Sequence, residues 1–575
     1  MKQSSLARAN ARAACLWLVA FGVAAEVVAC AGGGTPQAAG GAAGAVAAGA
    51  PPSAGSGDVG QAGSALGGSS GSLAGGASDA GAAGAAGAAG AAGNNGGGAS
   101  ASAGSAGASG SSGAAGNGGA GGSAGSGAGG AGNITSHLQD LKQAVIDQHF
   151  GLFLHFGILT YTGSWAQGNL PIDQFNPTKL DPAQWAAAAK AAGAKFGVLT
   201  TRHHDGFALW PSKASDFNVG HIAWRNGQGD VVKEYVTAFR AAGLEPGFYY
   251  SIWDATQNNA DPTPAQITYI KTQLTELLTN YGKIPLLVFD GWGWKMGHRK
   301  VVFAEIHDLV KSLQPDIVIS DHNGVTSPYD EDLVMYEEPK GTFAPADNSW
   351  AALQGNKINA SGGNDWFWAP GIGSLMSVQS IVNDHLNTLS QRHTTFLLNC
   401  PPNRDGLFDQ AIVDRLAEVG KAWAPAASSK LPDQGVQNNH PLAIRAATAT
   451  SGNADNALDG LNDYGSHTVW EAAATLPQSI TLDLGSQQPN VGFLGYLPPY
   501  SGAASSTAGN ITSYSIEVSS DGTTFSAGTS GTWLADGQLQ HATFGPFPAR
   551  YIRLTVKAVS SGSPAATELT LGMQP

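Results

Sequence analysis

Between Ile134 and Ala424, short apolar runs alternate with segments of helical periodicity, and this alternation constrains the fold more than any other feature of the chain. Strands that alternate with helices form a parallel sheet, and over roughly 290 residues they predict a (β/α)8-type barrel. Seven strands are recognisable, so one is missed or degenerate: Gly151–Phe156, Phe196–Thr201, Pro246–Ser251, Pro285–Asp290, Asp316–Ser320, Leu333–Glu337 and Thr395–Asn399. The helices expected between them are Pro182–Ala192, Asp230–Ala242, Pro264–Tyr281, Lys300–Leu313 and Val378–Arg392.

Polar and aromatic side chains gather where these strands end. In such a barrel the carboxyl ends of the strands converge on one face, where catalytic groups sit. A collection of this kind at almost every strand end therefore predicts an active site on that face. Its members are His155, His203, His204, Asp205, Trp253, Asp254, Asp290, Asp321 and Glu337.

Two carboxyl groups among these residues suit the cleavage of a glycosidic bond with retention. That reaction needs carboxyl groups about 5–5.5 Å apart; one attacks the anomeric carbon, and the other protonates the leaving oxygen and later activates water. Asp290 fits the first role, because an apolar strand delivers it to the barrel mouth. Glu337 or Glu338 could supply the acid. Neighbours on a strand face opposite sides, so one of these two is expected to be only supportive.

The three histidines at the strand ends, His155, His203 and His204, are neutral donors and acceptors that suit sugar hydroxyls. A zinc site is the weaker alternative, since no further ligand has a convincing spacing. Tryptophans near the strand ends could stack on sugar faces, although any one of them could equally belong to the core: Trp165, Trp210, Trp253 and Trp292.

A tract made almost wholly of Gly, Ala and Ser lies ahead of the barrel region, between about Ala31 and Gly132. It accounts for much of the unusual composition, in which 80 residues are glycine and only 12% are charged. Such a tract cannot bury enough apolar surface to offset its ordering entropy, so it is expected to be a disordered tether. The domain organisation expected is a signal segment at 1–30, a linker at 31–133, a catalytic barrel at 134–430 and a β-sandwich at 431–575.

The N-terminal segment has the features of an export signal. Basic residues precede the apolar run Ala13–Ala25, and Val27–Cys30 resembles a bacterial lipobox. We therefore expect cleavage before Cys30, lipidation of that cysteine and anchoring to a bacterial membrane or cell surface, with ordinary secretion as the alternative. The tether fits an anchor, because it would hold a folded domain away from the membrane.

Net charge and hydropathy argue against a nucleic-acid partner and against a membrane span in mid-chain. The formal net charge is −13 and Lys and Arg form no blocks, so a nucleic-acid partner is not expected. No internal stretch offers about 20 consecutive apolar residues, so no membrane span is expected in mid-chain. Cys400 stands far from the other two cysteines and is expected to be a small buried apolar residue.

From about Leu431 onward the strands are short, turns rich in Ser, Thr and Gly are frequent, and helical periodicity is absent. Strands are expected at Ser479–Leu484, Ser513–Ser519 and Tyr551–Val556, with a turn at Ser520–Gly522. This pattern predicts a β-sandwich.

The segment from Phe150 to about Trp423 resembles the α-L-fucosidases of glycoside hydrolase family 29. The similar motifs are Gly151–Gly157, Ala192–Trp210 with its His-His-Asp-Gly-Phe core, Tyr249–Asp254, Leu287–Gly291 and Phe396–Asn403. The resemblance implies a retaining exo-α-L-fucosidase that acts on fucosylated oligosaccharides or glycoconjugates and needs no cofactor. It implies that Asp290 is the nucleophile and that His155, His203 and His204 bind fucose. Trp210, Trp253, Asp254 and Trp292 are further candidate substrate contacts because of their places near the strand ends. The acid/base residue varies within this family; Glu337 aligns best with the family's aromatic-Glu position, and the choice between Glu337 and Glu338 stays open.

Two departures from the family pattern bear on specificity. Ala166–Asn169 stands after Trp165, where broad-specificity members carry a Glu-Trp-Tyr-like segment, and Val288 stands where an aromatic residue is often found. By contrast, Asn226–Val232 and Gln273–Gly282 resemble the branch that prefers α-1,3/1,4-linked fucose on branched glycans.

The C-terminal region resembles the discoidin-type modules, also called factor five/eight type C, that often bind carbohydrate beside glycosidases. The similar motifs are Asn456–Gly460, Trp470, Ile480–Gly485, Gly495–Pro498, Ser519–Gly522 and Arg550–Arg553. The resemblance implies a possible structural calcium, for which Asp459 and Glu568 are candidate ligands, although both could equally be ordinary polar residues of turns and strands.

Two other functions compete with the fucosidase. One is a non-catalytic surface lectin with a degenerate barrel; the presence of a full carboxyl pair argues against it. The other keeps the enzyme but changes the sugar to a relative such as galactose. An apolar pocket around the methyl group of fucose would disfavour galactose, though by only a few kcal/mol.

Overall fold

The computed structural model describes residues 131–162, 167–257, 261–321, 332–359, 366–371, 373–433, 441–463, 466–499 and 507–574. The signal segment, Cys30, the tether up to residue 130 and Trp165 lie outside these residues. The chain divides into two compact units, Met1–Asn117 and Gly118–Pro575, and only the second contains described residues. None of the helices that the structure describes is both long and apolar enough to cross a membrane.

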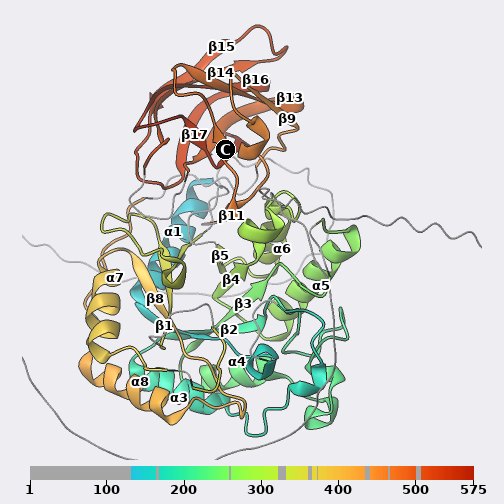
Figure 1. The fold of residues 1–575 in the computed structure, drawn as a ribbon, viewed down its shortest axis with the longest axis vertical. Helices are drawn as coiled ribbons and strands as arrows, with labels where there is room; N and C mark the ends of the chain where they lie inside the picture. The colour runs from blue at the N-terminus through green and yellow to red at the C-terminus, as the bar shows by residue number, and fades with distance from the viewer. Residues whose placement is uncertain are drawn as a thin grey trace, which may run out of the picture. The chain divides into compact units, whose positions relative to one another are not determined.

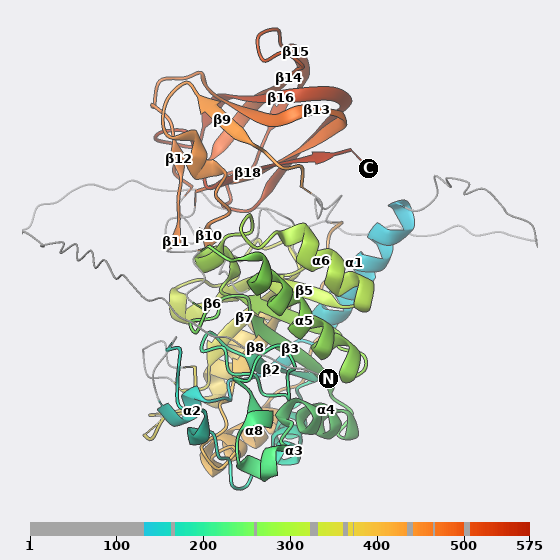
Figure 2. The same cartoon turned by 90° about the vertical axis from the view of Figure 1, so that its right-hand side faces the viewer.

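Eight parallel strands form a near-closed barrel, with helices outside the ring (Figure 1, Figure 2). Their order is β5-β4-β3-β2-β1-β8-β7-β6, and a parallel bridge between Ser320 and Leu333 joins the two ends of the series. The expected (β/α)8-type barrel is confirmed. The strands are β1 (Phe150–Leu154), β2 (Phe196–Arg202), β3 (Glu245–Ser251), β4 (Leu286–Asp290), β5 (Val318–Asp321), β6 (Val334–Glu337), β7 (Ala352–Lys357) and β8 (Thr394–Asn399).

The strand that sequence analysis missed is β7. Its sequence, Ala-Leu-Gln-Gly-Asn-Lys, has two apolar side chains and no β-branched residue, so local propensity gives no strand signal. Pairing with β6 on one side and β8 on the other overrides that weak propensity.

Helix boundaries follow from local capping. Asp181 accepts hydrogen bonds from the backbone N–H groups of Ala183 and Gln184 at the start of α3, and Thr263 with Gln266 forms a capping box on α5. The α-helices are α1 (Ala131–Asp147), α2 (Leu159–Thr162), α3 (Pro182–Ala192), α4 (Val231–Ala241), α5 (Pro264–Asn280), α6 (Phe303–Leu313), α7 (Thr388–Ser390) and α8 (Gln410–Ala422). The 3-10 or π turns are η1 (Ile172–Gln174), η2 (Val219–His221), η3 (Trp224–Gly227), η4 (Trp292–Met296), η5 (Glu338–Lys340), η6 (Ser380–Asn387) and η7 (Ala454–Ala457).

The five expected helices are present with small shifts of boundary, and one of them is divided. The segment expected as the helix Val378–Arg392 consists of the π-helical η6 followed by the short α7. Helix α8, which follows the last barrel strand, was not expected.

Side chains of the barrel strands alternate between two buried layers, as the pleat requires. One layer packs the strands against the helices and includes Leu287, Phe289 and Tyr336. The other fills the barrel interior and includes Tyr249, Val288 and Met335. Both faces of a parallel sheet are buried in this way, which explains the almost wholly apolar strands. Cys400, just after β8, is buried as expected.

The C-terminal region is an antiparallel β domain, coloured orange to red in Figure 2, and it confirms the expected all-β class. Its main sheet has the order β15-β14-β16-β13-β18, and β9 also pairs with β13. Alternate residues of β13 are buried from Gln478 to Leu484, as in a strand with one solvent-facing side. The strands are β9 (Ala446–Ala449), β10 (Asn462–Asp463), β11 (Ser466–His467), β12 (Trp470–Glu471), β13 (Gln478–Leu497), β14 (Ile511–Ser519), β15 (Ser526–Thr532), β16 (Gln540–Val559), β17 (Ala565–Ala566) and β18 (Glu568–Met573).

Candidate active site

The alternation along β4 and β6 directs two carboxyl side chains into the barrel mouth. Val288 and Met335 belong to the interior layer, so Asp290 and Glu337, two residues further along each strand, point to the same side. Both side chains are buried, with Asp290 7% and Glu337 3% exposed. The structure therefore brings together the two strand-end carboxyl groups from which sequence analysis predicted the chemistry.

Asp290 is held by donors on both of its carboxylate oxygens. Tyr249 Oη donates to Oδ2 at 2.7 Å, and Trp294 Nε1 donates to Oδ1 at 2.8 Å. The backbone N–H of Gly291 also donates to Oδ1, at 2.5 Å, from a glycine with φ of 66°. Burial, and then the negative charges of Asp290 and Glu337, raise the pKa of Tyr249 well above its ordinary value, so its hydroxyl stays a donor. The carboxylate is thus fixed in one orientation.

The three predicted histidines lie side by side next to Tyr249. The ring centroids of His203 and His204 are 4.1 Å apart, and those of His155 and His203 are 5.6 Å apart. His155 Nδ1 lies 2.9 Å from Asn399 Oδ1, and His204 Nδ1 lies 2.7 Å from the hydroxyl of Ser251. One nitrogen of each of these two rings is thereby committed to the scaffold, which fixes the direction in which the other faces.

The structure gives His203, His204 and Asp290 a geometry that could also hold a cation. Each offers one ligand atom, and these atoms lie within 4.8 Å of one another. The donors from Tyr249 and Trp294 nevertheless point their positive ends at the two oxygens that a metal would need. The arrangement suits a carboxylate that attacks carbon better than one that binds a metal.

Glu337 and Glu338 face different neighbours. Glu337 Oε2 lies 3.2 Å from Lys340 Nζ, and the charge of Glu337 contributes to the raised pKa of Tyr249. Glu338 Oε2 accepts hydrogen bonds from Asn356 Nδ2 at 2.6 Å and from His385 Nε2 at 2.7 Å.

Glu338 changes the pKa of His385. Burial lowers the pKa of His385, but the hydrogen bonds to Glu338 and to the carbonyl of Ser380 outweigh burial and raise it above its ordinary value. The two adjacent glutamates therefore belong to separate clusters.

Among the other predicted contacts, only Trp253 joins the cluster around Asp290. Its ring lies 5.2 Å from His204 and 5.5 Å from Trp294, between centroids. The remaining three lie in the scaffold. Trp210 is buried and donates to Glu276, Trp292 is buried and donates to the carbonyl of Val301, and Asp254 accepts hydrogen bonds from Thr256 and Tyr269.

Several residues of the cluster were missed by sequence reasoning. Tyr249 and Asn399 could have been found from strand alternation, because each lies on the interior face of its strand near the carboxyl end. Trp294, Trp366 and Lys340 carry no such signal, since loops and turns after the strands bring them in. Trp366 stacks on His155 with 5.0 Å between ring centroids.

A buried charged layer lies behind the histidines. Asp205 accepts a hydrogen bond from the backbone N–H of Phe207 at 2.8 Å, and burial raises its pKa to about 7. Arg202 is fully buried, 3.6 Å from Asp254, with its guanidinium 4.3 Å from the ring centroid of Tyr250. This layer fixes the end of β2, from which His203 and His204 follow.

Asp205→Asn should make the protein relatively more stable as the pH rises. The folded wild type keeps the Asp205 proton up to about pH 7, whereas the ordinary pKa of an aspartate is 3.8, so the wild type loses stability between these values. Asparagine does not titrate and can still accept the Phe207 hydrogen bond. The unfolding free energy of the variant relative to wild type should increase by about 2–3 kcal/mol from pH 5 to pH 8. Urea unfolding at both pH values measures this difference, and a constant difference would count against a buried, proton-holding Asp205.

In the β domain, Asp459 and Glu568 are brought together around Gly460. Glu568 is fully buried; its Oε2 accepts a hydrogen bond from Gly460 N at 2.9 Å, and its Oε1 accepts none among the described residues. Burial raises the pKa of Glu568 well above its ordinary value. Asp459 accepts hydrogen bonds from Leu461 N and from the hydroxyl of Thr468. Burial favours the protonated form of Glu568, and a bound cation would instead stabilise its ionised form.

Two family models match the chain. Residues 133–426 match the alpha-L-fucosidase family, and residues 443–569 match the F5/8 type C domain.

The similar curated proteins include alpha-L-fucosidases of plants and animals. Alpha-L-fucosidase 1 of Arabidopsis thaliana is 31% identical over 343 residues, covering 54% of this chain and 65% of that protein. Tissue alpha-L-fucosidase of Homo sapiens is 25% identical over 287 residues, covering 43% and 54%. The chain thus spans less than two thirds of the length of either relative. Alpha-L-fucosidase isoenzyme 1 from Paenibacillus thiaminolyticus, a solved structure, is 23% identical with a TM-score of 0.44, covering 73% of this chain and 100% of that one. From the family match over 133–426, this chain belongs to the alpha-L-fucosidase family.

Proposed function

We propose that this protein is a retaining exo-α-L-fucosidase that releases terminal L-fucose from fucosylated glycans. The observation that carries the proposal is the immobilised carboxylate of Asp290, held by Tyr249 and Trp294 beside the histidines. A nucleophile that must reach one carbon atom gains from such fixed orientation. Membership of the alpha-L-fucosidase family supports the same choice of reaction.

In this mechanism Asp290 attacks the anomeric carbon of fucose while Glu337 gives its proton to the leaving glycosidic oxygen. The bond from carbon to the leaving oxygen breaks, and an ester bond from carbon to Asp290 forms. Glu337, now ionised, then takes a proton from a water molecule that attacks the same carbon. The ester bond breaks, and fucose leaves with its original anomeric configuration.

Glu337 is preferred to Glu338 as the acid/base because of the direction of its side chain. Glu337 lies on the same interior face as Asp290, buried in the barrel mouth. Glu338 already accepts two hydrogen bonds, from Asn356 and His385, and its side chain is 37% exposed.

The histidines and tryptophans around Asp290 suit a sugar. His155, His203 and His204 offer ring nitrogens to hydroxyl groups, and Trp253 and Trp294 offer apolar ring surface to the face of the pyranose. Fucosylated oligosaccharides or glycoconjugates are thus the substrates we propose, with no cofactor for the reaction itself.

The linkage we propose is α-1,3/1,4 on branched glycans. Parallel assays on a branched α-1,3/1,4-fucosylated oligosaccharide and on a linear one with terminal α-1,2-fucose test both the activity and the linkage. Release of fucose from the branched substrate alone supports both. Release from the two substrates keeps the fucosidase and rejects the linkage. Release from neither, by a folded protein that still binds sugar, favours the alternative of a lectin with an inactive barrel.

Calcium should stabilise the C-terminal β domain if Glu568 and Asp459 help to bind it. The Oε1 of Glu568 lies 3.8 Å from Arg299 Nε but accepts no hydrogen bond from the described residues, so calcium would give it a direct contact in the folded state only. A ligand that binds only the folded state raises the unfolding temperature. We expect 1 mM calcium to raise the unfolding temperature of EDTA-treated protein by several degrees, and Glu568→Gln to remove most of that increase. Scanning calorimetry with magnesium as the control ion measures it; an equal response of wild type and variant would reject these ligands.

For localisation, we propose export and anchoring to a bacterial membrane or cell surface through lipid on Cys30, with residues 31–133 as the tether. The apolar run before Cys30 and the Gly/Ala/Ser composition after it support this proposal. Fractionation of a bacterial host that expresses wild type or Cys30→Ser tests it. The wild type should sediment with membranes and the variant should not, while membrane association of both would reject Cys30 as the anchor point.

A further inference from the structure

The β domain contacts the loop that follows the nucleophile strand. Within the unit Gly118–Pro575, β10 and β11 adjoin η4, and the carbonyl of Gly460 accepts a hydrogen bond from His298 N at 3.2 Å. The approach is close on both sides. A Cβ on Gly460 would lie 2.8 Å from His298 N, and a Cβ on Gly297 would lie 3.1 Å from the carbonyl oxygen of Asp459.

A chain of hydrogen bonds runs from this contact toward Asp290. His298 Nε2 lies 3.0 Å from Asp321 Oδ2, and both side chains are buried. The same oxygen accepts a hydrogen bond from Gly293 N at 3.3 Å. Gly293 immediately precedes Trp294, whose indole N–H donates to Asp290. The turn at Gly460 is therefore linked, through His298 and Asp321, to Gly293. This glycine precedes Trp294, which donates the hydrogen bond to Asp290.

On the side of the β domain, the turn itself is fixed. Gly460 N donates to the fully buried Glu568, and Arg299 Nε lies 3.8 Å from the other oxygen of that carboxylate. The backbone of Gly460 thus carries a hydrogen bond in each direction, inward to Glu568 and outward to His298.

A second contact reaches the strand that carries Glu337. Gln538 Nε2, in the turn between β15 and β16, donates to Tyr336 Oη at 3.2 Å. Nearby, the rings of Trp350 and His541 meet edge to face at 6.4 Å. The β domain therefore contacts the surroundings of both carboxyl groups of the proposed reaction.

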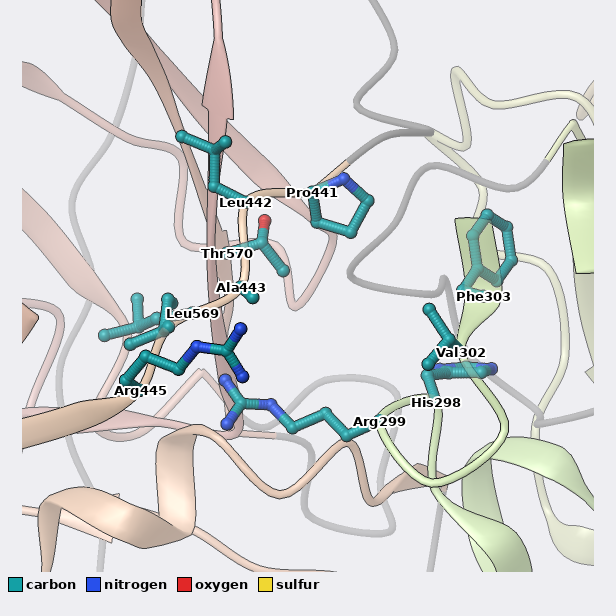
Figure 3. Close-up of a pocket in the computed structure, with 11 residues that line it drawn as sticks. His298, Arg299, Val302, Phe303, Pro441, Leu442, Ala443, Arg445, Leu569 and Thr570 are labelled. Atoms are coloured by element: carbon teal, nitrogen blue, oxygen red, sulfur yellow. The ribbon is translucent and has the colours of Figure 1, made fainter. Parts of the chain in front are cut away.

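Apolar packing does not fill the whole contact. A cavity of about 330 Å³ adjoins it, lined in part by His298, Arg299, Val302, Leu442 and Arg445. Figure 3 shows the side chains of Arg299 and Arg445 pointing toward each other there. Two like charges do not hold surfaces together. The ion pair of Arg299 with Glu568 and the hydrogen bonds at Gly460 and Gln538 are therefore the polar contacts that fix the loops here.

We propose that the C-terminal β domain is a working part of the catalytic centre, in which Gly460 and Gln538 are positioning residues for Trp294 and Glu337. The proposal rests on the proposed fucosidase function and adds to it. A domain that only bound glycans would raise the local concentration of substrate, whereas a positioning domain sets the rate on a small substrate that has no glycan to bind.

The test compares Gly460→Ala with Gly562→Ala in the full chain. Both glycines have positive φ, 76° and 70°, so alanine strains the backbone alike; a Cβ at Gly562 meets nothing within 4 Å, whereas one at Gly460 meets His298. Active sites are counted with a 2-fluoro-fucosyl fluoride, and kcat per site is measured on 4-nitrophenyl α-L-fucoside.

Gly460→Ala should lower kcat per site by about 10-fold or more, since displacement of a positioned group by 1 Å can cost ~100-fold. KM should change little, and Gly562→Ala should match the wild type. Wild-type kcat per site in Gly460→Ala, or equal losses in both variants, would overturn the proposal. If Gly460→Ala does not fold, Gln538→Ala replaces it in the test, with Gln488→Ala as the matched control. Gln538→Ala should lower kcat about threefold, and Gln488→Ala should not.

Hydrogen exchange separates the proposal from the proposed function. The amide of Gly293, bonded to Asp321, should exchange faster in Gly460→Ala than in Gly562→Ala, whatever the activity. Equal exchange at this amide would reject the positioning link. A wild type that releases no fucose, yet shows the difference in exchange, would reject the fucosidase and leave the link in place.

Discussion

Asp290→Gly should lower kcat on 4-nitrophenyl α-L-fucoside by at least about 1,000-fold, because losses of this size or larger follow removal of a nucleophile. The variant should remain folded, since glycine leaves the neighbouring Tyr249 and Trp294 free to bond water. Asp316→Asn, at an exposed aspartate paired with His137 and Lys283, is the control and should keep wild-type kcat.

Azide should restore activity to the Asp290→Gly variant. The small anion can occupy the space left by the carboxylate and attack the anomeric carbon from the same side, which restores turnover and yields β-fucosyl azide. Proton NMR of the product gives its configuration. An α-configured azide, or a variant that keeps most of its kcat without azide, would show that Asp290 is not the nucleophile.

The barrel could be predicted from the sequence because the pattern of an apolar strand followed by a helix occurs several times along the chain. Apolar strands such as Leu286–Asp290 and capped helices such as Pro182–Ala192 each carry a local pattern, and their alternation admits few folds. β7 was missed because it has the composition of a loop and owes its conformation to its neighbours. α8 was missed although Ile412, Leu416 and Val419 have helical spacing, because it lies beyond the last strand that was recognised.

Most of the candidate site residues that were predicted lie at a strand end or within two residues of it, and those further along a loop were missed. Asp290, Glu337 and the histidines stand at strand ends, so topology alone gathers them. Trp294 reaches Asp290 only because Gly291 adopts a positive φ and η4 turns the chain back, which no local pattern announces. Conversely, Trp210 and Trp292 were candidates for stacking on a sugar, but both lie in the core.

The choice between two adjacent glutamates shows what geometry adds. Sequence alone left the choice between Glu337 and Glu338 open, although Glu337 aligns better with the family pattern and neighbours on a strand face opposite ways. The interior position of Met335 decides which of them faces Asp290. The position of Met335 thus places Glu337, and not Glu338, on the face of the strand that points into the barrel.

Glu337→Gln should therefore separate the two steps of the reaction, while Glu338→Gln should not. Glutamine keeps the shape of Glu337 but cannot give a proton to the leaving oxygen. On a fucosylated oligosaccharide, whose leaving group needs that proton, kcat/KM should fall by about 100- to 10,000-fold. On 4-nitrophenyl α-L-fucoside, whose leaving group departs unprotonated, kcat/KM should fall far less.

The second step gives a further signature of the same variant. Without a base to activate water, the fucosyl-enzyme ester should accumulate and be visible by intact-protein mass spectrometry, and azide should speed its release. Glu338→Gln is the matched control: its amide oxygen can still accept the hydrogen bond from Asn356, so kcat/KM on both substrates should stay within about threefold of wild type. If Glu338→Gln rather than Glu337→Gln shows the dependence on the leaving group, the acid/base assignment is reversed, because a proton donor is identified by the substrate whose leaving group requires it.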